Sequence, residues 1–222
     1  MARTARLGAL AAVLTAGFVL VLAAPSAPAA DAASGHSAVG AKAAFQDDMR
    51  KLWEDHIIWT RQFIVSAATL PDNLPDISAT TERLLANQTD IGNALRPFYG
   101  DAAAEAVTGL LREHILTAAD LVFAAKAGDT AAVEAASAAW YANADAIATA
   151  LHGLNPEHWP LDEMKAHMKD HLDLTLEEAV ARLQGRYADD VAAYDAIHGQ
   201  ILAMADMLSA GIIAQIPSAF AH

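Results

Sequence analysis

The sequence predicts an all-α protein, a six-helix bundle built from three repeated αα-hairpins. Alanine is abundant and runs of β-branched residues are rare, which favours helices over strands. Apolar residues recur at spacings of three and four, the period of a helix with one buried face. A short pattern also returns at a nearly constant interval, which is typical of a repeated supersecondary unit.

A signal peptide is predicted over residues 1–30. Arg3 and Arg6 precede an apolar run over residues 7–24, and small residues suited to cleavage ("APA") follow at 27–29. The alternative is a membrane anchor, for which the apolar run is short. We expect cleavage, a secreted or extracytoplasmic location and no membrane contact afterwards. The Ala-, Ser- and Gly-rich segment 31–44 is expected to be a flexible lead-in.

Proline and glycine set the limits of the first three predicted helices. The first covers residues 45–70 and ends at "PDNLPD". The second covers residues 76–96 and ends before Pro97, because a proline disfavours helical backbone in the residue preceding it. The third begins at Asp101, a plausible N-cap, and ends near Gly128.

The last three helices are bounded in the same way. The fourth begins at Asp129 and ends at "GLNP". The fifth begins at Pro160, which suits a first helical position, and ends at Gly185. The sixth runs from Tyr187 to Ile216, just before a proline. We therefore expect one helical domain over residues 45–217, with hairpins at about 45–97, 101–156 and 160–217.

The repeated pattern carries a histidine. "WEDHI" (53–57), "LREHI" (111–115) and "MKDHL" (168–172) each read apolar, any, acid, His, aliphatic. The three histidines lie on otherwise apolar helical stripes, and each return helix carries an aspartate near its middle. At 1.5 Å per residue these side chains fall at similar heights, which predicts a polar layer across the bundle. Its members are His56, His114, His171, Asp90, Asp145 and Asp206.

Two interpretations of this layer follow from the chemistry of buried polar groups. In the first, each imidazole pairs with the carboxylate of its own hairpin, which satisfies both groups and fixes the register of the helices. In the second, the three imidazoles bind Zn, Cu or Fe with carboxylates behind them. Met164, His167 and Met168 share a helix face with His171 and favour copper, although the same spacing also fits an ordinary core stripe.

Composition excludes several classes of function. The formal net charge of −13 disfavours nucleic acid as a partner. The chain has no cysteine, which removes disulfides, thiolate chemistry and cysteine-ligated metals. Motifs of metalloproteases, serine hydrolases, P-loop proteins and dinucleotide-binding proteins are absent from the sequence.

These observations predict a non-enzymatic binding protein for a metal ion or small ligand. The alternatives are a structural or protein-interaction bundle, in which the histidines serve folding alone, and a His-dependent enzyme that uses a His–Asp pair as acid and base. The sequence does not determine the oligomeric state, nor whether the hairpins close around an axis or stack in a row.

The runs "LWEDHIIWTRQFI", "ALRPFYGD", "WYANADAI", "EAVARLQGRYADDVAAYD" and "MADMLSAGI" resemble those of a family of small bacterial helical proteins, many of them exported or from spore-forming bacteria. The similarity covers roughly residues 48–217. It implies a single domain. It implies no activity, cofactor or catalytic residue.

Overall fold

The computed structural model describes residues 30–221, which form five α-helices, one 3₁₀ helix and no strand. The predicted all-α class is confirmed. The elements are α1 (Ala30–Ala68), α2 (Ile77–Ala127), α3 (Thr130–Leu154), α4 (Leu161–Leu183), α5 (Tyr187–Gln215) and η1 (Pro217–Phe220).

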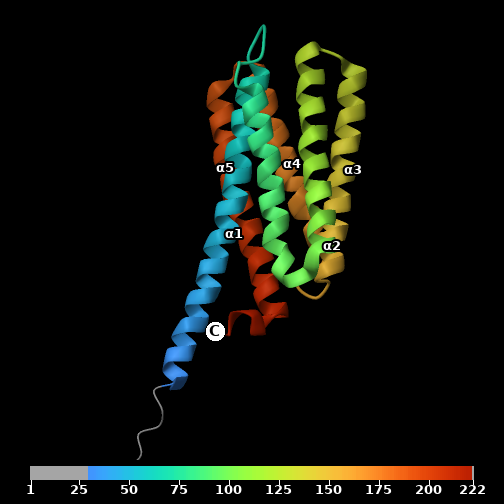
Figure 1. Cartoon of the computed structure of the whole chain (residues 1–222). Coiled ribbons are helices and arrows are strands. Elements are labelled where there is room, and N and C mark those ends of the chain that lie inside the picture. Colours follow the sequence, from blue (N-terminus) through green and yellow to red (C-terminus); the bar gives the residue numbers. More distant parts are fainter. Residues whose placement is uncertain (1–29, 222) are drawn as a thin grey trace, which may run out of the picture.

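Five helices are counted where the sequence predicts six, because α2 joins the second and third predicted helices. Pro97 lies inside α2, and a few residues later Gly100 has a non-helical backbone (φ 79°, ψ 177°). Figure 1 shows that the parts of α2 before and after this glycine run in opposite directions. Glycine adopts a positive φ without a Cβ clash, so the chain reverses here without a separate loop.

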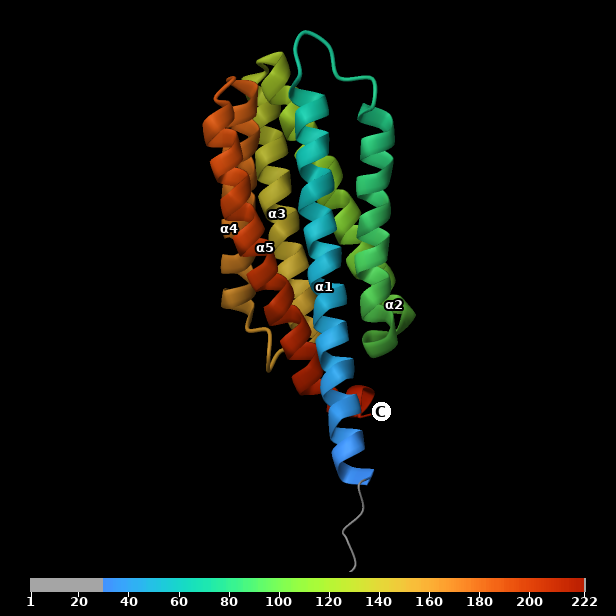
Figure 2. The same ribbon diagram turned by 90° about the vertical axis from the view of Figure 1, so that its left-hand side faces the viewer.

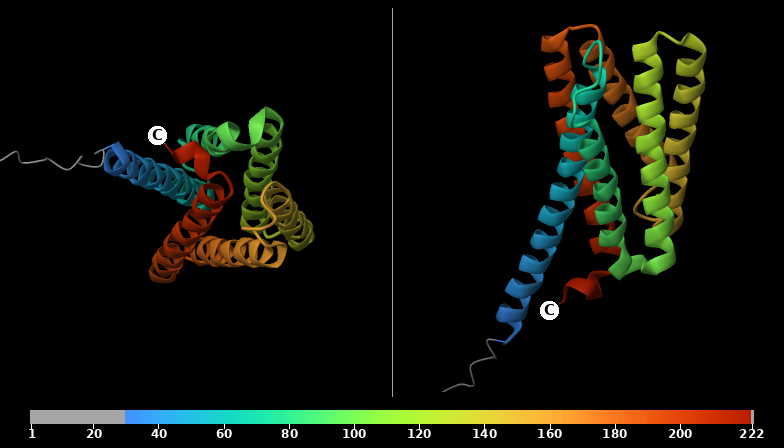
Figure 3. Two further views of the ribbon diagram at one scale, coloured as in Figure 1. Left: turned by 90° about the horizontal axis from the view of Figure 1, so that it is seen from below. Right: turned by 45° about the horizontal axis from the view of Figure 1, so that its top comes forward.

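The helices close into a ring around a common interior. α1 packs along both α2 and α5, and contacts continue from α2 to α3, from α3 to α4 and from α4 to α5. Figure 3 shows this closed arrangement from below. Side chains from the first and last helices therefore share one core, which decides between closed and stacked helices in favour of closure.

Local chemistry explains most helix ends. α3 begins after Asp129, whose side chain accepts a hydrogen bond from the backbone N–H of Ala132. α2 and α4 are followed by Gly128 and Gly185, both with φ of 70°, as expected of glycine after a helix. Pro160 directly precedes α4. These limits agree with the predicted ones to within a residue or two.

The structure tests only part of what the sequence predicts for the N-terminal segment. The predicted signal peptide lies almost wholly in residues 1–29, which are outside the described residues. The sequence predicts a flexible lead-in over 31–44, whereas the structure has these residues in α1, which extends past the other helices at the lower end of the bundle (Figure 2). Alanine has the highest intrinsic helix propensity, which accounts for the longer helix.

The core runs the length of the bundle. At the lower end Phe45 and Phe98 pack against Phe220 of η1. Among the described residues, α5 alone is long and apolar enough to cross a membrane. Its residues Ile197 and Ile201 are fully buried against the other helices, and 44% of its apolar stretch lies inside the bundle.

Candidate functional site: a buried histidine layer

The structure brings the three repeated histidines together inside the bundle. His56 of α1, His114 of α2 and His171 of α4 are only 2%, 3% and 4% exposed. The ring centroids of His56 and His171 lie 5.6 Å apart, and those of His114 and His171 lie 6.4 Å apart. We call these three residues the histidine layer. Each histidine lies among apolar residues at helical spacing, which predicts this inward orientation. The closed arrangement of the helices then brings the three side chains together.

His114 is hydrogen-bonded at both ring nitrogens. Its Nδ1 lies 3.0 Å from Oδ1 of Asn143, and the indole N–H of Trp140 donates to its Nε2 over 3.2 Å. Indole is a donor only, so Nε2 must accept and Nδ1 must carry the proton. His114 is thereby fixed as a neutral ring of one tautomer.

The other two rings are anchored through Nδ1 alone. His171 Nδ1 lies 3.2 Å from Oε1 of Gln200, so this ring also carries its proton on Nδ1. His56 Nδ1 lies 3.2 Å from Nε2 of Gln88. That amide nitrogen has two hydrogens and lies closer to the oxygens of Leu84 and Asn87, so this contact does not fix the tautomer of His56. Within residues 30–221, no hydrogen bond reaches Nε2 of His56 or His171.

A second set of hydrogen bonds orients the amides that flank the layer. Asn143 Nδ2 donates to the carbonyl of Leu110, and Gln200 Nε2 donates to the carbonyl of His167. Each carbonyl belongs to the residue four positions before a histidine of the layer. In the first hairpin Asn87 makes the corresponding bond to the carbonyl of Leu52, while Gln88 contacts the ring. In each case the amide holds its own helix at a fixed height along the neighbouring helix that carries the histidine.

Burial keeps the imidazoles neutral. Desolvation and, after it, the neighbouring His171 together lower the pKa of His114 to about 3. Desolvation also lowers the pKa of His171 to about 4. The pKa of His56 is well below its usual range, first because the ring is buried and then because protonated His171 and His114 would repel its charge.

The three aspartates are not part of the layer, which corrects the predicted His–Asp pairs. Asp90, Asp145 and Asp206 have side chains 50%, 60% and 41% exposed. They face cationic side chains at the surface, namely Arg83, Lys165 and Arg50 respectively. A buried carboxylate would lose its hydration, whereas an uncharged amide anchors an imidazole at a smaller desolvation cost. Asparagine and glutamine therefore fill the role that we expect of aspartate.

The secondary cluster on α4 is only partly buried. Met164 and Met168 are core residues, whereas His167 is half-buried and its backbone carbonyl accepts the bond from Gln200. The two methionines belong to the same core cluster as Leu172. This agrees with a core stripe in which methionine fills space, and it leaves a role in copper binding as a prediction.

The layer does not form a complete metal site in this arrangement. Across residues 30–221, no group of three or more His, Asp or Glu side chains is placed to hold a metal ion. The physical reason is visible at His114, whose two nitrogens are already occupied, and at the aspartates, which lie on the surface. A trio of imidazole ligands would require the indole of Trp140 to leave Nε2 of His114.

A second buried polar cluster lies where α1, α4 and α5 meet. Arg61 contacts Glu178 at 2.6 Å and Asp190 at 2.8 Å, and Arg182 contacts Asp190 at 3.3 Å. Both carboxylates are almost fully buried. Burial raises the pKa of Glu178 to about 7, although the charge of Arg61 acts in the opposite direction. The cluster ties three helices together and has no free donor set for a ligand.

Sequence reasoning misses Asn143, Gln200, Gln88 and Trp140. A signal for the first two is present, because each follows its histidine by 29 residues. Trp140 carries no such signal, since an indole that donates to an imidazole looks like any apolar core residue in the sequence.

The fold and site together define a closed all-α bundle with a buried, amide-anchored histidine layer. Comparison of this chain with protein-family models, with curated proteins and with solved structures finds no match. The geometry of the histidine layer is therefore the basis for inferring a function.

Proposed function

We propose that the protein is an exported, non-enzymatic binding protein that takes a transition-metal ion at His56, His114 and His171. The observation that carries this proposal is the convergence of three neutral imidazoles, with centroid separations of 5.6 and 6.4 Å, inside one core. Neutral imidazole is the ligand form that Zn, Cu and Fe prefer. Orientation of each Nδ1 by a protein group is the usual support for a metal-binding histidine.

Among the candidate ions, copper in its cuprous state fits the layer best. The aspartates lie outside it, so no carboxylate neutralises the charge of a bound ion. The cost of burying a charge rises steeply with its magnitude, which disfavours a divalent ion at such a site. The thioethers of Met164 and Met168 in the same core suit this soft ion as well.

The proposal includes an internal threefold repeat, in which three αα-hairpins contribute one histidine each. Two features support it. The histidines follow one another at nearly equal intervals. Asn87, Asn143 and Gln200 each bond to the carbonyl four residues before a histidine. A shared ancestry of the hairpins would explain why both features occur three times.

A structural role is the second candidate, and the hydrogen bonds of His114 favour it. Both of its nitrogens are satisfied by Asn143 and Trp140, so the ring needs no ligand. Such a network would fix the height of each helix against its neighbour. In this case the bundle would act through its acidic surface on a protein partner, and nucleic acid would be excluded by the net charge of −13.

Titration with cuprous ion in the presence of a competing chelator separates the two candidates. Binding predicts a stoichiometric complex in the wild type that His171→Ala abolishes, whereas His158→Ala, outside the layer, leaves it intact. Trp140→Phe removes the donor that occupies His114 Nε2, a hydrogen bond worth about 1 kcal/mol. Binding therefore predicts a roughly fivefold gain in affinity for this variant.

A structural role predicts a different set of results. The wild type then binds no copper in competition with the chelator, and Trp140→Phe lowers the free energy of unfolding without creating a site. Copper that remains bound when both His56 and His171 are replaced would contradict the proposed site.

A further inference from the structure

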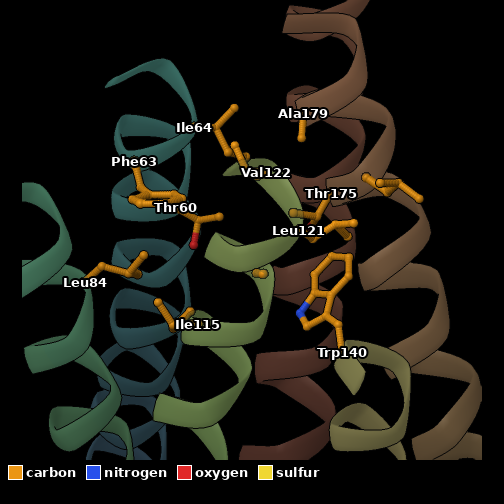
Figure 4. A pocket seen from close by; sticks show the side chains of 12 residues that line it. Thr60, Phe63, Ile64, Leu84, Ile115, Leu121, Val122, Trp140, Thr175 and Ala179 are labelled. Carbon is orange, nitrogen blue, oxygen red and sulfur yellow. The ribbon is translucent and has the colours of Figure 1, made fainter. Parts of the chain in front are cut away.

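A cavity of about 40 Å³ lies in the core, lined by side chains of α1, α2, α3 and α4 (Figure 4). Thr60 and Thr175 in its wall bond to the carbonyls of His56 and His171, which places it beside the histidine layer. Its walls include Thr60 and Ile64 of α1, Val122 of α2, and Thr175 and Ala179 of α4. These residues follow the histidines along their helices. The cavity therefore lies on the side of the layer toward which α1 ends.

The spacing of small residues explains why space remains there. Thr60, Ala118 and Thr175 each lie four residues after a histidine of the layer, and residues four apart share a helix face. At 1.5 Å per residue this level is about 6 Å from the imidazoles. Side chains with only one to three heavy atoms cannot fill the centre of a closed ring of helices. One turn further, Ala179 leaves the same gap on the α4 side.

The polar atoms in the wall are already engaged within the protein. The hydroxyl of Thr60 donates to the carbonyl of His56, and that of Thr175 donates to the carbonyl of His171, both over 2.8 Å. The indole N–H of Trp140, which also lines the cavity, donates to His114. The remaining lining side chains are Phe, Ile, Leu, Val and Ala. The cavity therefore offers no free donor to a polar guest.

We propose that this cavity is a binding site for a small uncharged apolar molecule of a few heavy atoms. The volume of about 40 Å³ is roughly three times the ~10–15 Å³ that one water needs, and water in it would lack the two to four polar partners that hold buried water. Apolar cavities in protein cores stay dry and take up xenon or small hydrocarbons. None of its lining residues is a histidine, so the site needs no bound metal, and Trp140 is the residue that it shares with the surroundings of His114.

Xenon is the probe, applied to the purified full chain with no metal added and followed by methyl NMR. The expected result is a saturable shift of the methyl resonances of Ile64 and Leu121, which line the cavity. The methyl groups of Ile201, buried elsewhere in the core, should not respond. Lining methyls that show no saturable shift, or that shift no more than Ile201, would overturn the proposal.

Filling the cavity provides the matched variant. Ala118→Leu places a larger side chain in the void and should abolish the xenon response of Ile64, whereas Ala146→Leu, at an exposed position, should retain it. Ala179→Val is a milder filling variant for use if Ala118→Leu does not fold, and it should weaken the response at least severalfold. An unchanged response in the folded filling variants would show that xenon binds elsewhere and would refute the assigned site.

Discussion

The amide of Asn143 serves two helices at once. Its oxygen faces Nδ1 of His114 and its nitrogen donates to the carbonyl of Leu110, while the neighbouring Asp145 reaches only Lys165 at the surface. Replacing Asn143 by Ala leaves the buried ring N–H of His114 without a partner, whereas the carbonyl of Leu110 keeps its hydrogen bond within α2. We expect the free energy of unfolding to fall by about 1–3 kcal/mol, the cost of one unsatisfied buried group.

Asp145→Ala is the matched control for this substitution. The pair that it breaks is exposed, and such pairs contribute about 0–1 kcal/mol. Urea unfolding of the two variants beside the wild type measures the difference. Equal losses, or a larger loss for Asp145→Ala, would restore the aspartate to the layer and contradict the geometry described above.

Only some members of the histidine layer and its surroundings could be predicted from the sequence. The histidines could be predicted, because each lies on an apolar stripe and the pattern around it occurs three times. Their partners could not be predicted from the aspartates, because a shift of two residues on a helix rotates a side chain by about 200° to the opposite face. Asp145 lies two positions after Asn143, so the amide points inward and the carboxylate outward.

Within α2, the close approach of its two parts depends on Gly92. A Cβ atom at this position would lie 1.9 Å from Oγ1 of Thr108 and 2.9 Å from the backbone oxygen of Ala104, both in the second part of the helix. Gly92→Ala should therefore push the two parts of α2 apart. We expect a loss of about 1–3 kcal/mol in the free energy of unfolding, as for other overpacked contacts.

Gly109, in the same helix, is the control because a Cβ there meets no atom within 4 Å. Gly109→Ala should stabilise the protein by about 0.5–1 kcal/mol, the usual gain when alanine replaces glycine inside a helix. Thermal unfolding monitored by circular dichroism measures both variants. A stabilising Gly92→Ala would show that the two parts of α2 are not in close contact there.

Helix limits could be predicted well where proline or glycine sets them, as at Pro160, Gly128 and Gly185. The number of helices could not be predicted. The sequence indicates that the chain turns near Gly100, but not that helical backbone continues directly on both sides of this residue. The extension of α1 over residues 31–44 could not be predicted from composition either, because alanine is common in both linkers and helices.

For the whole molecule, the buried imidazoles predict a fold that is sensitive to acid. Burial lowers the pKa of His114 to about 3 and that of His171 to about 4, from 6.5. Because the unfolded chain takes up these protons first, the stability contributed by the neutral rings is complete above pH 6.5. It is lost as pH falls from 6.5 to about 4 for His171 and to about 3 for His114. In this pH range, each ring lowers the free energy of unfolding by up to about 1.4 kcal/mol for each pH unit of acidification.

Glu178 acts in the opposite direction. Burial raises its pKa from 4.5 to about 7, so its contribution is complete below pH 4.5 and is lost as pH rises toward 7. The effect of this one carboxyl is smaller than the combined effect of the three imidazoles. We therefore expect the free energy of unfolding to be higher at about pH 7 than at about pH 5. Urea unfolding across this range measures the slope. His114→Asn should reduce it, His158→Asn should not, and a flat profile in the wild type would argue against buried neutral rings.

The protonation and tautomer of the three imidazoles test the whole account most directly. Long-range ¹H–¹⁵N NMR of the histidine side chains, recorded at about pH 7 and about pH 5, reports both for each ring. We predict that His114 and His171 carry their proton on Nδ1 and that all three rings stay neutral at both values. Rings that titrate near pH 6.5, like those of exposed histidines, would contradict the buried layer and every proposal built on it.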